Sequence, residues 1–480
     1  MYSNDLDTSP STDSSGLVVK AAAFHLRQEL GDLVEITLFE RSNSLGGRVA
    51  DALIDGQRVE LGGAVYSVVN RLVRDWVALF ALDTFDPTDT LPADAPAGAA
   101  DDRLGLWDGS RFVFQTGFSR LGNMVRGLGR YGFDSFRAKH LLFNDILPRF
   151  ERIYDRLQRD KQPLPSVDAM LRLMEFEPLV HVTLRDFLLT NATFNRAFVD
   201  EMVEAMSRVN YGQSNSELHA LVGLVSMVGG FGDCRTVRSG NSHLVRLLVN
   251  ASRAETLLDA AVTAVSLDDA AAATSSSSSY RVEYLTTNEA GSRERRTRSF
   301  DAVVIASPLD SSGSQIALSA IPNIATKLTK LRPYHVTHAT FVTGTARLAD
   351  YFGQPSAYSS QPHKILATAD ASAFTSLVVK HRFSHGSERR LYKVFSRAAL
   401  NDTLLDLLFD GRTSTSRKVW EAYPKLAPLS HAPDIVLHER LFYLNAFEYA
   451  FSTIETEALA GLNAALLVRD AFLRSAPSRH

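Results

Sequence analysis

The sequence predicts a mixed α/β fold, α+β overall, in which a discontinuous dinucleotide-binding domain carries an inserted, largely helical domain. The first observation is the β-rich run "VEITLFE" (34–40), which a helix-forming stretch precedes and two glycine pairs follow, Gly46-Gly47 and Gly62-Gly63. The second is that further strand and helix patterns of the same kind recur only near residues 238–307 and after about residue 435. At 480 residues, with 45% apolar and 22% charged residues, the chain has room for two or three soluble domains.

The first part of the chain alternates between strand and helix signals. "AAAFHLRQEL" predicts a helix over 21–30, and "VEITLFE" predicts a strand. A hairpin is expected over 48–66, because Asp55-Gly56 is a strong turn signal between two short β-rich runs. From about 70 to 208 the apolar periodicity is mostly helical. The exceptions are a Pro/Ala/Asp-rich loop over 86–102 and a strand pair around 106–117.

The second half begins with a predicted helix over 242–252 and a strand over 260–267. The serine-rich stretch 271–279 is expected to be a loop. A hairpin then leads into a buried strand over 302–306, and the basic run Arg293–Arg298 is predicted to be a solvated turn at its end. A mixed α/β region follows, and a helix is expected from about Ile454.

Composition excludes several classes of protein. The formal net charge of −3 argues against nucleic-acid binding, and no apolar run approaches the roughly 20 residues that span a bilayer. The longest such run, 218–232, is expected to be buried core. One cysteine, Cys234, excludes an intramolecular disulfide. The three Asn-x-Ser/Thr sequons at Asn191, Asn250 and Asn401 are most simply explained as chance matches.

The beginning of the chain lacks two expected features. Residues 1–15 are polar and expected to be disordered, with no signal peptide. The glycine-rich turn that should precede the first helix falls on "SSGLVV" (14–19), where only Gly16 remains of a G-x-G-x-x-G pattern. Either the sequence is a truncated or misassembled reading of its gene, from which the first strand and the glycine turn are missing, or the protein is a degenerate member of a dinucleotide-binding family and has lost affinity for its cofactor. We favour the first explanation, because the later motifs are intact.

Those later motifs suit a dinucleotide. Glu40 ends a strand where a carboxylate can accept both hydroxyls of an adenosine ribose, and Arg41 follows it. The glycine pairs allow the backbone to approach a bound group closely, and Arg48 can donate to a phosphate. Each feature alone is compatible with a surface carboxylate or an ordinary turn. Two glycine pairs in one hairpin, each beside a charged residue, favour binding.

Several blocks together resemble a known family. "LFERSNSLGGRVA" with "GQRVELGGAVY" resembles the amine-oxidase-type FAD proteins. "RVNYGQSNSELHALVGLVSMVG", "VRSGNSHLVRLLVNAS", "FDAVVIASPL" and "ERLFYLNAFEYAFSTIETEALAGLNAALL" are similar to the prenylcysteine oxidase, or prenylcysteine lyase, family. The resemblance implies a Rossmann-like FAD-binding domain of the glutathione-reductase and amine-oxidase type. We expect that domain at 16–70, 235–310 and 435–480, and a substrate domain at 71–234 and 311–434.

The resemblance also implies positions for the cofactor FAD. Ser452 and Thr453 open the C-terminal helix that points at the pyrimidine side of the flavin in such proteins, although an ordinary capped helix is equally compatible. Val262 corresponds to an adenine contact, and its alternative is a core strand. Gly240 and Asn241 form the remaining turn near the flavin, where Ser239 replaces a glycine. Four polar residues are pocket candidates, each with a structural alternative: Tyr211, Gln213, Asn445 and Glu448.

The activity implied by the resemblance is oxidative cleavage of farnesyl- or geranylgeranyl-cysteine, with O₂ as the electron acceptor and H₂O₂ as a product. Alternatives are a related flavin oxidase or desaturase acting on an amine or isoprenoid, and a non-catalytic remnant. A lysosomal or vacuolar lumen is where related proteins occur. No metal is expected: His381 and His385 have H-x-x-x-H spacing but read as parts of a strand pair around a turn, where they lie too far apart to share an ion.

Overall fold

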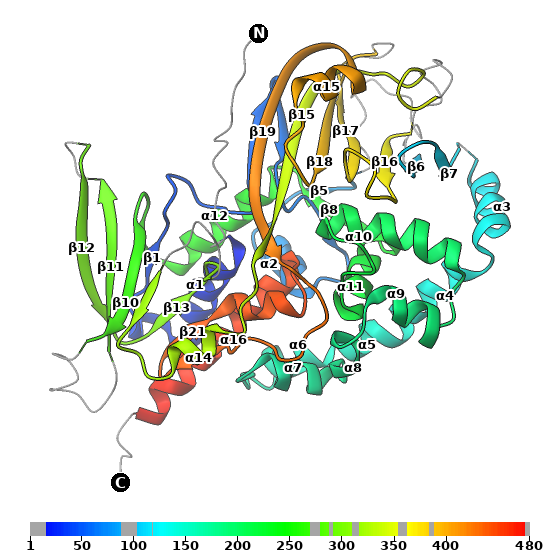
Figure 1. Ribbon diagram of the computed structural model, residues 1–480. Helices are drawn as coiled ribbons and strands as arrows, with labels where there is room; N and C mark the ends of the chain where they lie inside the picture. Colours follow the sequence, from blue (N-terminus) through cyan, green and yellow to red (C-terminus); the bar gives the residue numbers. More distant parts are fainter. Residues whose placement is uncertain are drawn as a thin grey trace.

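The computed structural model of the protein describes eight stretches of the chain (Figure 1). They are residues 16–87, 103–117, 119–268, 279–287, 291–309, 316–353, 362–383 and 388–475. The residues expected to form a disordered N-terminus, most of the 86–102 loop, the serine-rich loop and His385 lie outside them.

Three segments that are distant in sequence come together beside a group of three helices. Strand β1 (Thr37–Phe39) runs parallel to β9 (Glu255–Leu257), and β13 (Val303–Ile305) runs parallel to β21 (Leu441–Tyr443), which also pairs with β20 (Val436–His438). These two parallel pairs belong to separate sheets in the described part of the chain. Three helices pack together beside them, as Figure 1 shows: α1 (Leu17–Leu30), α12 (Asn241–Ser252) and α16 (Ile454–Ser475). The predicted helices and strands are confirmed, with α1 longer and β1 shorter than expected.

The predicted hairpin is formed by β2 (Asp51–Ile54) and β3 (Gln57–Glu60). Asp55 and Gly56 both have positive φ, 49° and 75°, as the tight turn between two twisted strands requires. Short strands β4 (Tyr66–Ser67), β5 (Thr84–Phe85) and β8 (Cys234–Val237) form a small sheet that joins this region to the helical part.

The basic run was predicted to be a turn, and this prediction is wrong. A sheet in the order β12-β11-β10-β14 contains it, and Arg293–Arg298 lies within the outer strand β12 (Arg293–Phe300). Long arginine side chains suit an edge strand, because they reach solvent and neighbouring carboxylates such as Glu283 and Glu255. The other strands are β10 (Ala261–Leu267), β11 (Tyr280–Thr287) and β14 (Ala317–Ser319).

A seven-stranded sheet unites the 104–115 and 334–424 segments. Its order is β19-β15-β18-β17-β16-β6-β7, and only β6 and β16 are parallel within it. The expected strand pair around His381 is confirmed as β17 with β18. The strands are β6 (Leu104–Trp107), β7 (Phe112–Gln115), β15 (Tyr334–Ala346), β16 (Lys364–Ala367), β17 (Ser376–Arg382), β18 (Arg390–Ser396) and β19 (Phe409–Pro424).

Helices between residues 71 and 231 form the remaining layer, as their periodicity predicted. They are α2 (Arg71–Leu79), α3 (Arg120–Tyr131), α4 (Asp134–Leu141), α5 (Leu147–Phe150), α6 (Arg152–Tyr154), α7 (Val167–Met174), α8 (Glu177–Val180), α9 (Leu184–Asp186), α10 (Glu204–Tyr211) and α11 (Ala220–Phe231). Wider π-type turns link several of them, at Leu142–Ile146, Asp155–Arg159, Phe187–Asn191 and Phe198–Val203. Two short helices lie elsewhere, α14 (Ile324–Leu328) and α15 (Asp402–Leu408), with single helical turns at Gly31–Leu33 and Leu444–Tyr449.

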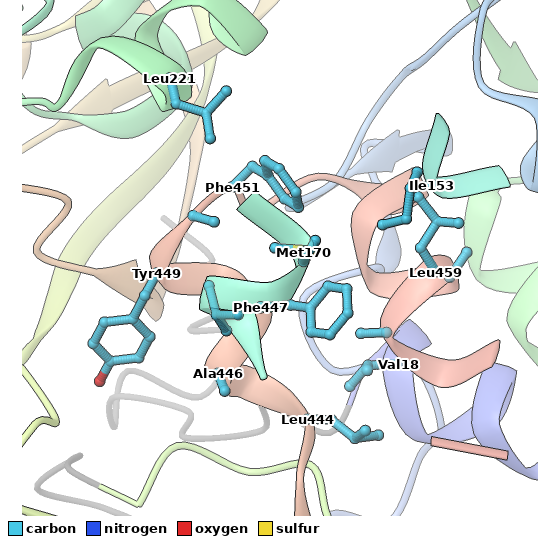
Figure 2. Packing of buried hydrophobic residues seen from close by; sticks show 14 of the residues in the cluster. Val18, Ile153, Met170, Leu221, Leu444, Ala446, Phe447, Tyr449, Phe451 and Leu459 are labelled. Carbon is cyan, nitrogen blue, oxygen red and sulfur yellow. The ribbon is translucent and has the colours of Figure 1, made fainter. Parts of the chain in front are cut away.

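One hydrophobic core joins the helical layer to the α1–α16 region. Figure 2 shows Ile153 and Met170 from the helical layer packed near Phe447, Phe451 and Leu459. Asn463 of α16 reinforces this junction, since its amide bonds both the N–H (2.7 Å) and the C=O (3.0 Å) of Leu164. The run 218–232 is buried core through Met227, as expected. Among the described helices, none is both long and apolar enough to cross a membrane.

Candidate active site

A cavity of about 430 Å³ lies between the helical layer, the seven-stranded sheet and the start of α16. Its wall is mainly apolar where α5, α10 and α11 contribute Leu147, Phe150, Val209, Val225 and Val228. Seven of the residues predicted to bind cofactor or substrate line it: Gly16, Arg48, Gly62, Gly63, Tyr211, Ser452 and Thr453.

The second glycine pair forms a tightly constrained part of the wall. The N–H of Gly63 donates to the carbonyl of Arg48 at 2.8 Å. A Cβ on Gly62 would lie 2.1 Å from that same carbonyl oxygen, so no other residue fits there. Asn241 holds this segment from behind, since its side chain donates to the Gly63 carbonyl at 3.0 Å. Its own N–H donates to Glu60 at 2.7 Å.

Arg48 lies at the cavity wall within a buried set of carboxylates. Its guanidinium bonds both oxygens of Glu448 and the Ala422 carbonyl, and lies 3.8 Å from Glu457 Oε1. Burial alone would lower the pKa of Arg48, but Glu448 and Glu457 outweigh it and raise that pKa. Burial, and then Glu448, raises the pKa of Glu457 well above its usual range. The set therefore holds Arg48 fully charged beside a carboxyl group that resists ionisation.

Glu448 and Asn445 support Arg48 rather than line the cavity. Glu448 is fully buried and accepts hydrogen bonds from Asn445 Nδ2 (2.8 Å) and the Tyr334 hydroxyl (3.1 Å). Gln213 is likewise structural in its contacts: it donates to the Tyr211 carbonyl and accepts from the N–H of Leu426. These three candidates occupy buried positions behind the cavity wall.

The N-terminus of α16 opens onto the cavity. Thr453 and Thr456 cap it reciprocally, each side chain accepting from the other's N–H at 3.1 and 2.8 Å. The Ser452 carbonyl accepts from the Tyr211 hydroxyl at 3.1 Å. Glu455, the next acidic residue, is used elsewhere: it accepts from the first N–H groups of α2 and from Tyr154. The arrangement leaves the start of a long helix directed at the space in the cavity.

Aromatic groups form another part of the cavity wall. Tyr211 and Tyr423 meet edge to face at 5.1 Å between ring centroids, and His335 stacks on Tyr423 at 5.9 Å. Burial, and then Arg397, lowers the pKa of His335 to about 4, so its imidazole is neutral at pH 7. This part of the wall is therefore aromatic, and its imidazole carries no charge at pH 7.

Lys393 and Trp420 are among the cavity residues that were not predicted from the sequence. Lys393 Nζ donates to the Glu60 carbonyl at 3.0 Å and lies 4.4 Å from the Phe395 ring centroid. Burial, and then Lys380, lowers its pKa well below the usual range. The indole N–H of Trp420 is buried and meets no acceptor within the described ranges. The one signal for Lys393 in the sequence was a charged residue at an inward position of β18.

The remaining predicted contacts lie apart from the cavity lining. Glu40 is buried at 2% exposure, where it accepts from Lys20 Nζ at 3.0 Å and from Ser42 Oγ at 3.0 Å. Arg41 is exposed next to it. Other predicted residues occupy turns or strands in the same half of the molecule: Gly46 (φ 140°), Gly47 (φ 53°), Gly240 (φ 90°) and Val262 of β10.

Gly16 connects the two regions, because it caps α1 and also lines the cavity. No cluster of three or more His, Cys, Asp or Glu side chains arranged for a metal ion occurs in the stretches that the structure describes.

Known proteins resemble this chain in sequence and in fold. The sequence model of the family described as prenylcysteine lyase matches residues 114–478. Prenylcysteine oxidase 1 from Mus musculus is 30% identical over 473 residues, covering 94% of this chain and 87% of the mouse protein. Farnesylcysteine lyase from Arabidopsis thaliana is 31% identical over 453 residues, covering 92% of this chain and 83% of the plant protein.

Solved structures resemble the chain at lower identity. Cyclohexylamine oxidase from Brevibacterium oxydans IH-35A superposes with a TM-score of 0.57 at 14% identity, covering 96% of this chain and 98% of the oxidase. A redesigned putrescine oxidase gives a TM-score of 0.57 at 13% identity, with the same coverage of both chains. At such identities the likeness establishes a shared fold.

Proposed function

The chain belongs to the prenylcysteine lyase family, and we propose that it is an FAD-dependent oxidase that cleaves the thioether of farnesyl- or geranylgeranyl-cysteine. In the proposed reaction prenylcysteine, O₂ and water give cysteine, the isoprenoid aldehyde and H₂O₂. The C–S bond breaks, the isoprenoid C1 is oxidised to the aldehyde, and O₂ is reduced by two electrons. FAD, when bound, supplies the two-electron oxidation.

The cavity residues suit a flavin on three structural grounds. Gly62 and Gly63 present backbone without a side chain to the cavity, so a ring can lie close to them. The α16 N-terminus offers N–H groups and a positive dipole end to a negatively charged ring edge. The buried Trp420 N–H needs an acceptor that the described residues do not provide. Arg48, Gly62, Gly63, Ser452 and Thr453 would hold the ring at this wall.

The residues predicted to hold the adenosine half are arranged less openly. Glu40 keeps the position expected of a ribose-binding carboxylate, but its ion pair with Lys20 must be shared with, or yield to, the ribose hydroxyls. Arg41 and Val262 remain proposed contacts of FAD in this half. Gly46 and Gly47 remain proposed contacts of a ring or the pyrophosphate, and Gly240 and Asn241 remain proposed to form a turn near the flavin.

The apolar wall supports an isoprenoid substrate. Leu147, Phe150, Val225 and Val228 offer a surface without charge, along which a long hydrocarbon chain loses its contact with water. Arg208 and Arg397 line the same cavity and both bind Asp370, so they would offer positive charge to the carboxylate of the amino-acid end. The observation that carries the proposal is that one cavity is lined by Gly62 and Gly63, by the N-terminus of α16 and by an apolar surface.

The test is to purify the chain, add FAD, remove the excess and record the visible spectrum. Bound flavin, together with turnover of farnesylcysteine to farnesal with one H₂O₂ per aldehyde, is the expected result. Gly62→Ala should abolish the flavin spectrum, whereas Gly129→Ala, on an open helix surface, should leave it unchanged. Failure of FAD to bind refutes the cofactor assignment, and flavin binding without aldehyde formation refutes the substrate.

A further inference from the structure

Helix α3 turns its apolar stripe away from the protein. Leu121, Met124 and Val125 have the i, i+3, i+4 spacing of one helix face, yet they are 66%, 47% and 60% exposed. Tyr131, at the last turn, is the only buried residue of the helix. A surface helix ordinarily buries such a stripe against the core, so this helix is oriented the opposite way.

Specific polar contacts fix that orientation. The Asn123 amide bonds the N–H (2.6 Å) and the C=O (2.9 Å) of Gly117. Arg130 forms a two-pronged ion pair with Glu201, with both distances at 2.6 Å. Arg126 donates to the carbonyl of Gln115 at 3.3 Å. The polar face of α3 is thus bound to the protein, and its apolar face remains outside.

The following segment also exposes apolar side chains. Phe133 precedes α4 and is 71% exposed, and Phe136 within α4 is 55% exposed. Figure 1 shows α3 and α4 at the periphery of the molecule, on the side away from the β10–β12 sheet. We call these five side chains the outer apolar patch: Leu121, Met124, Val125, Phe133 and Phe136.

The charges beside the outer apolar patch have one sign. Arg120, Arg137 and Lys139 are exposed there. The single acidic residue between 119 and 141 is Asp134, which is buried and paired with Arg137 at 2.6 Å. Apolar side chains flanked by cations are the composition that binds anionic lipid surfaces. A second copy of this chain, docked by two-fold symmetry, would instead bring cations against cations.

We propose that α3 and α4 dock the outer apolar patch onto an anionic membrane surface. The aliphatic and aromatic side chains enter the boundary between headgroups and acyl chains, and the arginine and lysine side chains contact lipid phosphates. The site is peripheral: α3 lies in the membrane plane. The inference rests on exposure and charge alone and does not depend on the reaction proposed above.

The test is flotation of the full chain with vesicles of phosphatidylcholine and phosphatidylserine, compared with vesicles of phosphatidylcholine alone. The wild-type chain should float with the anionic vesicles, and less so at high salt, which screens the phosphate contacts. Leu121→Ser/Val125→Ser should reduce the bound fraction by roughly tenfold or more, because two side chains lose their burial in lipid. Leu53→Ser/Leu407→Ser is the matched control, since both leucines are exposed elsewhere, and it should bind as the wild type does.

Circular dichroism and the melting temperature show that each variant is folded, as expected for changes at exposed positions. Two results overturn the proposal: a wild-type chain that does not float with anionic vesicles, and equal binding by the α3 double variant and the wild type. Dimerisation that depends on Leu121 and Val125, without vesicle binding, would also overturn the proposal and would assign the patch to a second copy of the chain.

Discussion

At the scale of single residues, the carboxylate that was predicted to bind a ribose is already paired with a buried lysine. Lys20 and Glu40 form an ion pair with side chains only 1% and 2% exposed. The position of Glu40 at the end of β1 was predictable from sequence, but its partner was not, because Lys20 reads as one more helix-forming residue of α1. Removing one member of such a pair leaves a charge in the interior without compensation.

We therefore expect Lys20→Met to lower the free energy of unfolding by about 3–5 kcal/mol. Lys20→Met/Glu40→Gln should be considerably less destabilised, since no unpaired charge remains. Urea denaturation of the wild type, both single variants and the double variant gives the coupling energy. Additive effects of the two single substitutions would contradict a coupled pair.

Glu60 predicts a specific pH dependence. Burial raises the pKa of Glu60 to about 7, although the Asn241 N–H opposes the shift. The folded state therefore holds a proton that the unfolded state has released between about pH 4.5 and 7. Stability from this group is greatest below about pH 4.5 and falls as the pH rises to 7, by up to roughly 3 kcal/mol.

Glu60→Gln should remove this decline, so that the difference in unfolding free energy between wild type and variant changes across that pH range. Glu35→Gln, at an exposed position, is the control and should leave the profile of the wild type unchanged. A pH-independent difference between Glu60→Gln and the wild type would show that the carboxyl ionises normally.

At the scale of elements, a glycine marks the close packing of α1 on α16. A Cβ on Gly461 of α16 would lie 2.6 Å from Ala21 Cβ and 2.7 Å from the backbone nitrogen of Ala22. The small residues of "AAAF" therefore allow α1 to approach α16 closely. Backbone atoms cannot move aside as a flexible side chain can.

Gly461→Ala should lower stability by about 1–3 kcal/mol, despite the better helix propensity of alanine. Gly129→Ala in α3 is the matched control, because a Cβ there meets nothing within 4 Å. That control should raise stability by about 0.5–1 kcal/mol. Thermal or urea unfolding of both variants measures the contrast, and equal effects at the two sites would contradict the close contact.

The predictable elements are those with local signals. The Asp55-Gly56 hairpin, the C-terminal helix and the strand pair around His381 follow from neighbouring residues, and all are confirmed. The pairing of β6 with β16 did not follow, since more than 250 residues of sequence separate these strands and no local signal names the partner. The basic run was misassigned for a related reason: an edge strand and a turn both expose arginines.

The candidate site was predictable where glycine marks close approach, as at Gly62 and Gly63. The support beneath Arg48 was not, because Glu448 lies 400 residues away in sequence. Glu448 and Asn445 were identified as polar pocket candidates, yet they stand behind the wall and act through Arg48. Lys393 resembled any charged residue in an alternating strand.

At the scale of the whole molecule, one hydrophobic cluster joins the helical layer to α1 and α16, whereas most of the seven-stranded sheet packs on clusters of its own. Residues of α1, α16, the 444–451 segment and the helical layer belong to the same cluster. The cavity is also lined by segments from the helical layer, the seven-stranded sheet and α16. The domain limits proposed from the sequence remain a prediction. Because the helical layer and the α1–α16 region share a hydrophobic cluster, we expect the two proposed domains to unfold together.

A single unfolding transition is therefore expected in calorimetry, and FAD should raise its midpoint as one unit. At a concentration 100 times the dissociation constant the gain is about 2.7 kcal/mol. Gly62→Ala should melt without this shift, whereas Gly129→Ala should retain it. Two separate transitions, of which FAD moves only one, would show that the helical layer unfolds independently.

The contact between α1 and α16 can form only late in synthesis of the chain. Glu29 binds Arg469, 440 residues further along the chain. A ribosome releases α1 early, so its apolar face remains uncovered until nearly the whole chain has been translated. Chains truncated before α16 should consequently bind chaperones or aggregate, even when every residue lining the cavity wall before that helix is present.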